Sequence, residues 1–283
     1  MAIGAGAESM SRAAYFLPAG RWGQRVGDGQ IIDAMVGALT DPFGTGHMGI
    51  TAENLAAKHG FTREEQDAFS LESHRRAAAA IAAGHFKGQI VPVELKTKKG
   101  PAMFDTDEHV RKDAKPEDFA KLRPAFKKDG SVTAGNASGI NDAGAAVVLM
   151  EAAAAAKAGV KPLARLVAYA HAGVEPHIMG EGPIPAVQKV FQKAGLKPAD
   201  MSVIESNEAF AVQAMTVTKQ LGLDPAKVNP NGGAVALGHP IGATGAILTV
   251  KCLHELHRTG GRYGLVTMCI GGGQGIAAIF ERL

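Results

Sequence analysis

The sequence predicts a layered α/β fold made of two domains. Its 283 residues are enough for two domains with sizeable buried cores. Strand-like and helix-like segments alternate along the second half of the chain, and this alternation is typical of layered α/β proteins. An alanine-rich run over 151–158 is followed by Gly159 and Pro162, which mark a boundary. We therefore expect a first half over 1–151 and a second domain over 160–283.

Each element of the first half follows from a local pattern. The first ten residues are small and apolar and indicate the end of a strand, whereas 11–50 are rich in Gly and Pro and predict loops. Thr62 and Glu65 form a capping-box pattern, which predicts a long helix from there to Ala83. The other expected elements are a helix over 51–59, a strand over 90–95, charged loops over 96–130 with a short helix near 116–119, a strand over 145–150 and a helix over 151–158.

The second half has more regular periodicity. The expected strands cover 163–170, 203–206, 264–269 and 275–281, and the expected helices cover 185–194, 208–221 and 242–258.

Composition and charge exclude several classes of protein. A net charge of +3 is too small to indicate a nucleic-acid partner. Two cysteines do not make a disulfide framework, and no signal peptide or membrane-spanning run is present, so we expect a cytoplasmic protein with no membrane partner. Basic residues gather at 96–99 and 123–128, as a solvated face or a contact for a phosphate-bearing ligand. His254 and His257 share a helix without further ligands, so no metal site is expected.

Two glycine clusters near the C-terminus each hold a residue suited to catalysis. His239 lies within the run Asn229–Gly245, and Cys269 precedes three consecutive glycines. Taken alone, His239 could be a turn residue and Cys269 a buried structural thiol. However, plain packing seldom needs three flexible residues, and a thiol at a strand end beside backbone N–H groups is expected to have a lowered pKa.

Three further segments complete the pattern. Asn207-Glu208-Ala209-Phe210 lies at a predicted strand-to-helix junction, where Asn207 could also be a simple N-cap. Ser131–Asp142 is rich in Gly, Asn and Ser, and His47-Met48-Gly49 precedes Thr51-Ala52-Glu53-Asn54. Together with the two glycine clusters, these motifs closely resemble the thiolase family, in its acetyl-CoA acetyltransferase and β-ketothiolase branch, over essentially the whole chain.

The resemblance implies a fold of five layers, α-β-α-β-α, with a loop domain inserted in the first half to cover coenzyme A. By this mapping the loop domain covers about 11–135, and the second core domain lies within 160–283. Roughly a hundred residues expected of the first core domain have no counterpart in the sequence, so that domain is expected to be largely missing. An open sheet edge and an uncovered apolar face would then make the isolated chain poorly soluble.

The resemblance also implies a reaction, the reversible Claisen condensation of two acyl-CoA molecules to 3-ketoacyl-CoA and free CoA by a ping-pong scheme. His239 would activate the nucleophilic cysteine and Cys269 would move the α-proton. Asn207 would hold a water of one oxyanion hole, and the Gly271 N–H would serve another. The residues expected to contact the acyl-CoA are Ser138, His47, Met48, Arg111, Phe126, Ala134, Phe210 and Met179. Asp118 departs from the serine of some relatives, and an acid beside a phosphate would weaken binding unless it points away.

One catalytic residue of the family has no match here. The nucleophilic cysteine lies in a Cys-Gly-Ser-type motif, which this sequence lacks, and Cys252 is expected to pack within a helix. Two interpretations follow: an acyl-CoA C-acyltransferase whose remaining part is absent from this sequence or supplied separately, as in a split enzyme, or a non-catalytic CoA-binding module. In either case we expect CoA thioesters as ligands, no cofactor, and a homodimer or homotetramer.

Overall fold

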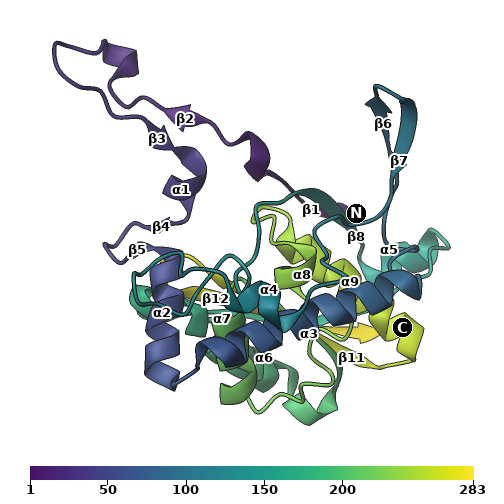
Figure 1. Cartoon of the computed structure of the whole chain (residues 1–283). Coiled ribbons are helices and arrows are strands. Elements are labelled where there is room, and N and C mark those ends of the chain that lie inside the picture. The colour runs from purple at the N-terminus through teal and green to yellow at the C-terminus, as the bar shows by residue number, and fades with distance from the viewer.

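The computed structural model describes all residues from 1 to 283, and a four-stranded mixed sheet forms its centre (Figure 1). Strand β10 runs parallel to β11, while β12 is antiparallel to both of its neighbours, β11 and β9. The sheet order is β10-β11-β12-β9. The strand bounds are Ala164–Gly173 for β9, Met201–Ser206 for β10, Tyr263–Ile270 for β11 and Gln274–Arg282 for β12.

Helices cover both faces of this sheet. On one face, α6 (Pro183–Ala194) buries Val187 and Val190 against a core that includes Leu265 and Ile279. On the other face, α9 (Thr244–Thr259) buries Leu248, Cys252 and Leu256 against Val203 and Val266. Apolar side chains spaced three and four residues apart place one stripe of each helix on the sheet, and their burial stabilises both layers. The packing role predicted for Cys252 is thus confirmed.

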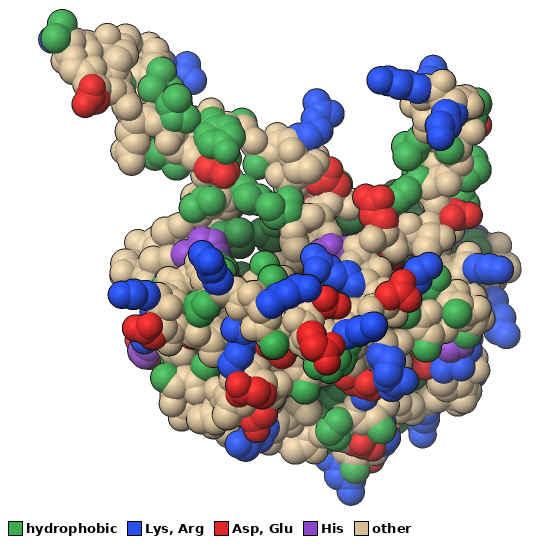
Figure 2. Space-filling model, in the orientation of Figure 1, with side chains coloured by type: hydrophobic (Ala, Val, Ile, Leu, Met, Phe, Trp, Pro, Cys, Tyr) green, Lys and Arg blue, Asp and Glu red, His purple; other side chains and the backbone are tan.

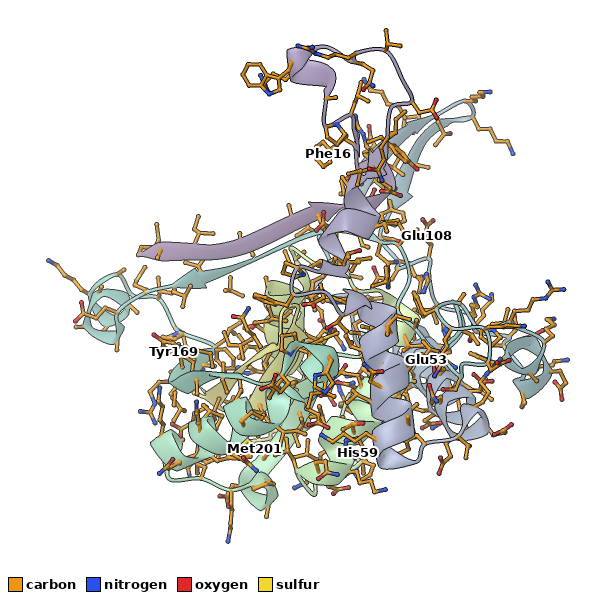
Figure 3. The ribbon with its side chains drawn as sticks, turned by 90° about the vertical axis from the view of Figure 1, so that its left-hand side faces the viewer. Phe16, Glu53, His59, Glu108, Tyr169 and Met201 are labelled. Carbon is orange, nitrogen blue, oxygen red and sulfur yellow. The ribbon has the colours of Figure 1, made fainter.

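Helix α9 also packs against a second sheet, which makes the fold layered. Strand β1 (Ala2–Ser9) pairs antiparallel with β8 (Asp142–Leu149) over their full lengths, and both strands contact α9 (Figures 1 and 3). On this small sheet, Ile3 and Val148 are exposed. The layered α/β class predicted from the sequence is confirmed, and so is the strand at residues 1–10.

The remaining helices gather beside the C-terminal sheet. They are α2 (Met48–His59), α3 (Arg63–Ala82), α4 (Pro116–Ala120), α7 (Ala211–Gln220) and the single turn α8 (Ala234–Leu237), with α5 (Ala152–Lys157) after β8. Thr62 and Glu65 form the capping box that the sequence predicted for α3, since each side chain bonds the other residue's backbone N–H. No helix is long and apolar enough to cross a membrane.

Two segments project from this body (Figures 1 and 2). The first is an arm containing β2 (Tyr15–Phe16) and β3 (Ile32–Asp33), followed by α1 (Ala34–Ala38) and the short pair β4 (Thr40–Asp41) and β5 (Gly46–His47). The second is a hairpin of β6 (Val93–Thr97) and β7 (Gly100–Phe104). Short 3₁₀ turns lie at Met10–Arg12, Gly20–Trp22, Pro176–Glu181 and Pro198–Asp200.

Three expectations need correction. The predicted strand at 90–95 begins at Val93, and its partner β7 lies in a stretch expected to be loop. Helix α8 was not predicted at all. Helix α7 begins at Ala211 rather than 208, because tertiary hydrogen bonds hold the preceding residues extended: the Asn207 N–H donates to the Thr267 carbonyl, and Phe210 bridges to Ala137. Phe210 occupies the N-cap position, so Asn207 is not a capping residue.

Candidate active site

His239 lies on the loop between α8 and α9, where hydrogen bonds fix both its backbone and its ring. Gly238 before it has a φ of 102°, a conformation open mainly to glycine. The His239 N–H donates to Asn141 Oδ1 at 3.2 Å. Ring atom Nδ1 lies 2.7 Å from the Thr244 hydroxyl, and Nε2 lies 3.3 Å from the Asn207 amide nitrogen. Burial lowers the pKa of His239 to about 4, so the imidazole is neutral near pH 7 and able to accept a proton.

Cys269 lies near the end of β11, in an apolar cluster. It is buried with Phe210, Met179 and Ala209, and Met48 packs against the same cluster. Burial raises the pKa of the Cys269 thiol to about 12, so the expected lowering of this pKa is wrong. The apolar neighbours disfavour the thiolate more than the nearby backbone dipoles favour it. At neutral pH Cys269 therefore holds its proton.

The three glycines after Cys269 form the turn that joins β11 to β12. Gly272 and Gly273 have φ values of 78° and 88°, so the hairpin itself requires two of them. Gly271 has a different effect, because a Cβ there would overlap Met48 Cε and would push this flexible side chain aside. The glycine run thus serves both the turn and a close approach to Met48, a residue expected to contact ligand.

Aromatic rings connect the loop-domain residues to this cluster. The His47 ring stacks on Phe126 with centroids 4.8 Å apart, and Phe126 meets Phe210 edge-on at 6.0 Å. The Ser138 hydroxyl donates to the Ala209 carbonyl at 3.0 Å. Segments far apart in the sequence therefore converge beside Cys269.

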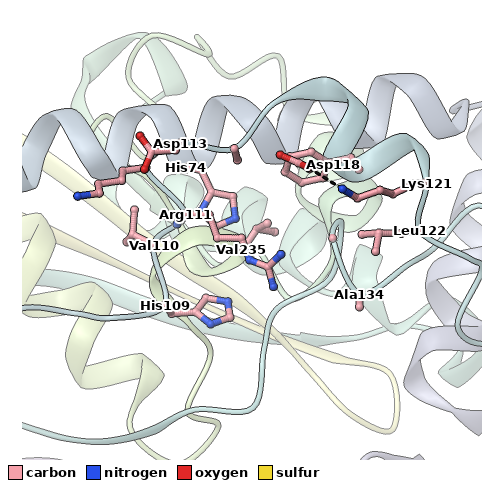
Figure 4. Close-up of a pocket in the computed structure, with 14 residues that line it drawn as sticks. His74, His109, Val110, Arg111, Asp113, Asp118, Lys121, Leu122, Ala134 and Val235 are labelled. Atoms are coloured by element: carbon pink, nitrogen blue, oxygen red, sulfur yellow. Dashed lines mark hydrogen bonds and ion pairs between the residues drawn. The ribbon is translucent and has the colours of Figure 1, made fainter.

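Arg111 and Ala134, the other two predicted contacts, lie on a cavity of about 460 Å³ (Figure 4). The rings of His74 and His109 line the same space, and His74 Nδ1 accepts the Arg111 backbone N–H at 3.1 Å. Neither His239 nor Cys269 lines this cavity, but Val235, on the helical turn leading to His239, does. The predicted residues therefore form two groups, one around Cys269 and His239 and one around this cavity.

Asp118, the departure noted in the sequence, also lines the cavity. Its carboxylate accepts from Lys121 Nζ at 2.8 Å and from the Lys115 N–H at 3.1 Å, and these hydrogen bonds lower the pKa of Asp118 (Figure 4). The carboxylate is thus ionised but paired with a lysine, which reduces the repulsion expected toward a phosphate.

Several site-forming residues were missed in the sequence. Asn141 and Thr244 hold His239. Glu53 is largely buried, and its carboxylate accepts the N–H groups of Ser131 and Val132, so it fixes the loop that leads to Ala134 and Ser138 (Figure 3). All three lie inside the motifs quoted above, but only the fold shows which side chains they contact.

The fold and the site define a layered α/β protein with a neutral histidine and a protonated cysteine beside an aromatic-lined region. The thiolase N-terminal domain family matches residues 1–153, and the thiolase C-terminal domain family matches residues 160–282.

Similar proteins agree with this match. The β-ketothiolase BktB of Cupriavidus necator is 66% identical over the whole chain, and the match covers 72% of that protein. The acetyl-CoA acetyltransferase of Allochromatium vinosum is 54% identical over 99% of the chain, and the match covers 72% of that protein. The crystal structure of human mitochondrial 3-ketoacyl-CoA thiolase superposes with a TM-score of 0.97 at 47% identity, covering 99% of this chain and 71% of that one. A second crystal structure of human mitochondrial 3-ketoacyl-CoA thiolase, in complex with CoA, gives 0.95 at 45% identity over 99% and 70%. The chain belongs to the thiolase family.

Proposed function

We propose that this chain provides the base, the proton-transfer thiol and the CoA-binding surfaces of an acyl-CoA C-acyltransferase, which condenses two acyl-CoA molecules reversibly to a 3-ketoacyl-CoA and free CoA. The observation that carries the proposal is the contact of Asn207 with His239 Nε2, since the Asn207 N–H also donates to the carbonyl of Thr267, two residues before Cys269 on β11. The names of two similar proteins, an acetyl-CoA acetyltransferase and a 3-ketoacyl-CoA thiolase, support it.

His239 acts as the general base in this scheme. Its low pKa keeps the ring neutral at neutral pH, so one ring nitrogen has a free lone pair that can accept the proton of an attacking thiol. Asn207 lies within 3.3 Å of Nε2 and is largely buried, so it can hold a polar group of the substrate or a water beside it. Once Nε2 has taken the thiol proton, Nε2–H and the group held by Asn207 can donate hydrogen bonds to the thioester oxygen as negative charge develops there.

Cys269 moves the proton on the α-carbon. Because its pKa is raised, the resting group is a thiol, ready in the cleavage direction to donate a proton to the carbanion left when the carbon–carbon bond breaks. In the synthetic direction the thiol first gives up its proton to solvent or to a departing group, and the resulting thiolate then removes the α-proton. The apolar neighbours Phe210 and Met179 exclude water from the reactive carbanion.

The cavity beside Arg111 and Ala134 receives the nucleotide portion of CoA in this proposal. Lys112, Lys121 and Arg111 line it, and their charges suit phosphate groups. The substrates are CoA thioesters, and no cofactor is needed. Neither cysteine of this chain corresponds to the acyl-accepting thiol of a ping-pong scheme. Cys252 lies on α9 and is buried between this helix and the sheet, and Cys269 has the proton-transfer role.

Deuterium exchange into acetyl-CoA tests the proton-transfer role directly. The protein is incubated with acetyl-CoA in D₂O, and label at the α-carbon is measured by mass spectrometry, alongside thiolysis of acetoacetyl-CoA. We expect Cys269→Ala and His239→Ala each to lower the exchange rate by ~10²- to 10⁴-fold, the usual range for a general acid or base. Cys252→Ala, at the other cysteine, should retain it. Exchange without thiolysis would indicate the CoA-binding module instead, and equal exchange in Cys269→Ala would overturn the assignment.

We also propose that the protein assembles with copies of itself through the β2–β3 arm. Trp22 is 87% exposed there, and Tyr15, Phe16 and Ile31 are exposed as well. Such an apolar surface on one projecting segment is typical of a protein interface. Replacing Trp22 and Phe16 with Ser should lower the oligomer mass measured by light scattering, and an unchanged mass would contradict this.

A further inference from the structure

The hydroxyl of Thr244 lies against the ring nitrogen of His239 that faces away from Asn207. Thr244 is the first residue of α9 and is 2% exposed. Its Oγ1 is 2.7 Å from His239 Nδ1 and 2.9 Å from the Pro240 carbonyl oxygen. The histidine ring is therefore held at both ends, by Thr244 at Nδ1 and by Asn207 at Nε2.

The proton inventory of these groups allows two arrangements. A neutral imidazole carries one N–H, and a threonine hydroxyl has one proton to donate. In the first arrangement Nδ1–H donates to Thr244, whose own proton goes to the Pro240 carbonyl, and the Nε2 lone pair faces Asn207. In the second the hydroxyl donates to Nδ1, and Nε2–H faces the Asn207 amide oxygen. The Pro240 carbonyl also accepts the N–H groups of Ala243 and Thr244. In the second arrangement this carbonyl oxygen would still lie 2.9 Å from the Thr244 oxygen, with no proton between the two.

Two observations favour the first arrangement. The Asn207 amide nitrogen, which is a donor, is the atom that lies 3.3 Å from Nε2, so Nε2 acts as the acceptor in this contact. The Thr244 hydroxyl has the bond to the carbonyl four residues earlier that threonines near the start of helices commonly make. Both place the ring proton on Nδ1.

We propose that Thr244 is a positioning residue that holds His239 as the Nδ1–H tautomer, so that Nε2 is the atom that exchanges protons in the reaction. When Nε2 takes a proton from a thiol, Nδ1–H continues to donate to the Thr244 hydroxyl oxygen, so this hydrogen bond is the same in the neutral and in the protonated ring. The hydroxyl therefore need not turn during the transfer. The tautomer stands on the geometry alone, whereas its catalytic consequence rests on the proposed acyltransferase function.

The test combines nitrogen NMR with kinetics on the full protein. In protein labelled with ¹⁵N at histidine, we expect the His239 signals to show a protonated Nδ1 and an unprotonated Nε2 near pH 7. Thr244→Val keeps the shape but removes the hydroxyl, and it should lower kcat for thiolysis by ~10²- to 10⁴-fold, as when a catalytic histidine loses the partner that fixes its tautomer. Thr244→Ser restores the hydroxyl and should return kcat to within about threefold of the parent.

Thr249→Val is the matched control, because Thr249 also lies on α9 and bonds the carbonyl four residues earlier but does not touch His239. It should leave kcat unchanged. An Nε2–H signal in the parent protein would overturn the proposal, and so would a Thr244→Val enzyme with parental kcat and an unchanged tautomer. If the parent protein has no acyltransferase activity, the proposed function fails, but the NMR spectrum still decides the tautomer. The NMR spectrum of the parent protein also decides the tautomer if the Thr244→Val variant does not fold.

Discussion

The carboxylate of Glu208 accepts the backbone N–H of Val235 at 3.1 Å, which ties the end of β10 to the segment that carries His239. The same carboxylate accepts from the Ser73 hydroxyl at 2.7 Å and from the Asn229 amide at 2.8 Å. Glu208 follows Asn207 in sequence. One fully enclosed side chain thus connects both partners of the Asn207–His239 contact to helix α3.

Removing this carboxylate should loosen the loop and the catalytic contact together. In Glu208→Ala three buried donors lose their acceptor, and we expect the free energy of unfolding to fall by about 1–3 kcal/mol for each donor that stays unpaired, because unpaired buried polar groups lose their hydration as well. Urea unfolding measures this change, and kcat for thiolysis should fall with it. Glu94→Ala, at an exposed carboxylate, is the control. Equal stability of the two variants would contradict the assigned role of Glu208.

Glu53 should affect substrate binding more than the chemical step. Its carboxylate accepts from the Ser131 and Val132 N–H groups at 3.0 and 2.9 Å and so shapes the loop that ends at Ser138. In Glu53→Gln the second oxygen, Oε2, which accepts the Ser131 N–H at 3.0 Å and the Ser131 hydroxyl at 3.3 Å, becomes an NH₂ group that faces these donors, so the loop will shift. We expect KM for acetoacetyl-CoA to rise roughly three- to tenfold, corresponding to the ~1 kcal/mol typical of one hydrogen bond, with kcat nearly unchanged. Initial-rate kinetics decide this, and a lower kcat at constant KM would be the opposite result.

The sequence predicted those parts of the fold that depend on local patterns. Helix α3 matches its predicted bounds to within one residue, because the capping box at Thr62 is a local signal. Of the β6–β7 hairpin, the sequence predicted only the first strand, over 90–95, whereas β7 was missed, because its stretch has no clear alternation and is defined by its pairing with β6. Tertiary hydrogen bonds likewise overrode helix propensity at 208–210.

In the candidate site, too, the sequence predicted what depends on local motifs but not what depends on tertiary contacts. His239 and Cys269 could be selected from motifs, but the pKa of Cys269 could not be predicted. Its value depends on Phe210 and Met179, which other segments bring to it, and this burial reversed the direction expected from the glycine turn. Likewise, Asp118 and Lys121 are three residues apart, so their pairing is local in the sequence. The position of this pair on the cavity, however, depends on the fold.

That pairing leads to a prediction about CoA affinity. Lys121→Gln leaves the Asp118 carboxylate without its lysine at the rim of the cavity, so CoA should bind more weakly, whereas Asp118→Asn frees Lys121 and should tighten binding. Exposed pairs contribute little, so we expect changes of roughly two- to fivefold in each direction, which shrink as salt is added. Calorimetric titration with CoA at low and high salt measures both. If the two variants shift the affinity in the same direction, charge at this position does not control binding.

Stability should fall as the pH is lowered from neutrality, because several histidines are buried in the neutral form. Burial lowers the pKa of His74 and of His239 to about 4 from an ordinary value of 6.5, and the pKa values of His47 and His109 are lowered as well. The unfolded chain therefore binds more protons than the folded chain between about pH 6.5 and 4, and stability rises with pH across that window. The contribution of these neutral histidines to stability is fully present above their unfolded-state pKa values and fully lost below their folded-state pKa values.

His74→Asn tests this linkage at one position. An asparagine oxygen can still accept the Arg111 N–H that His74 Nδ1 accepts at 3.1 Å, but it does not titrate. Urea unfolding near pH 7.5 and again near pH 5.5, where the carboxylates stay largely ionised, gives the loss of stability for each protein. We expect the variant to lose less than the parent over this interval, with His239 accounting for part of what is left. An identical loss in the two proteins would mean that burial does not hold His74 neutral.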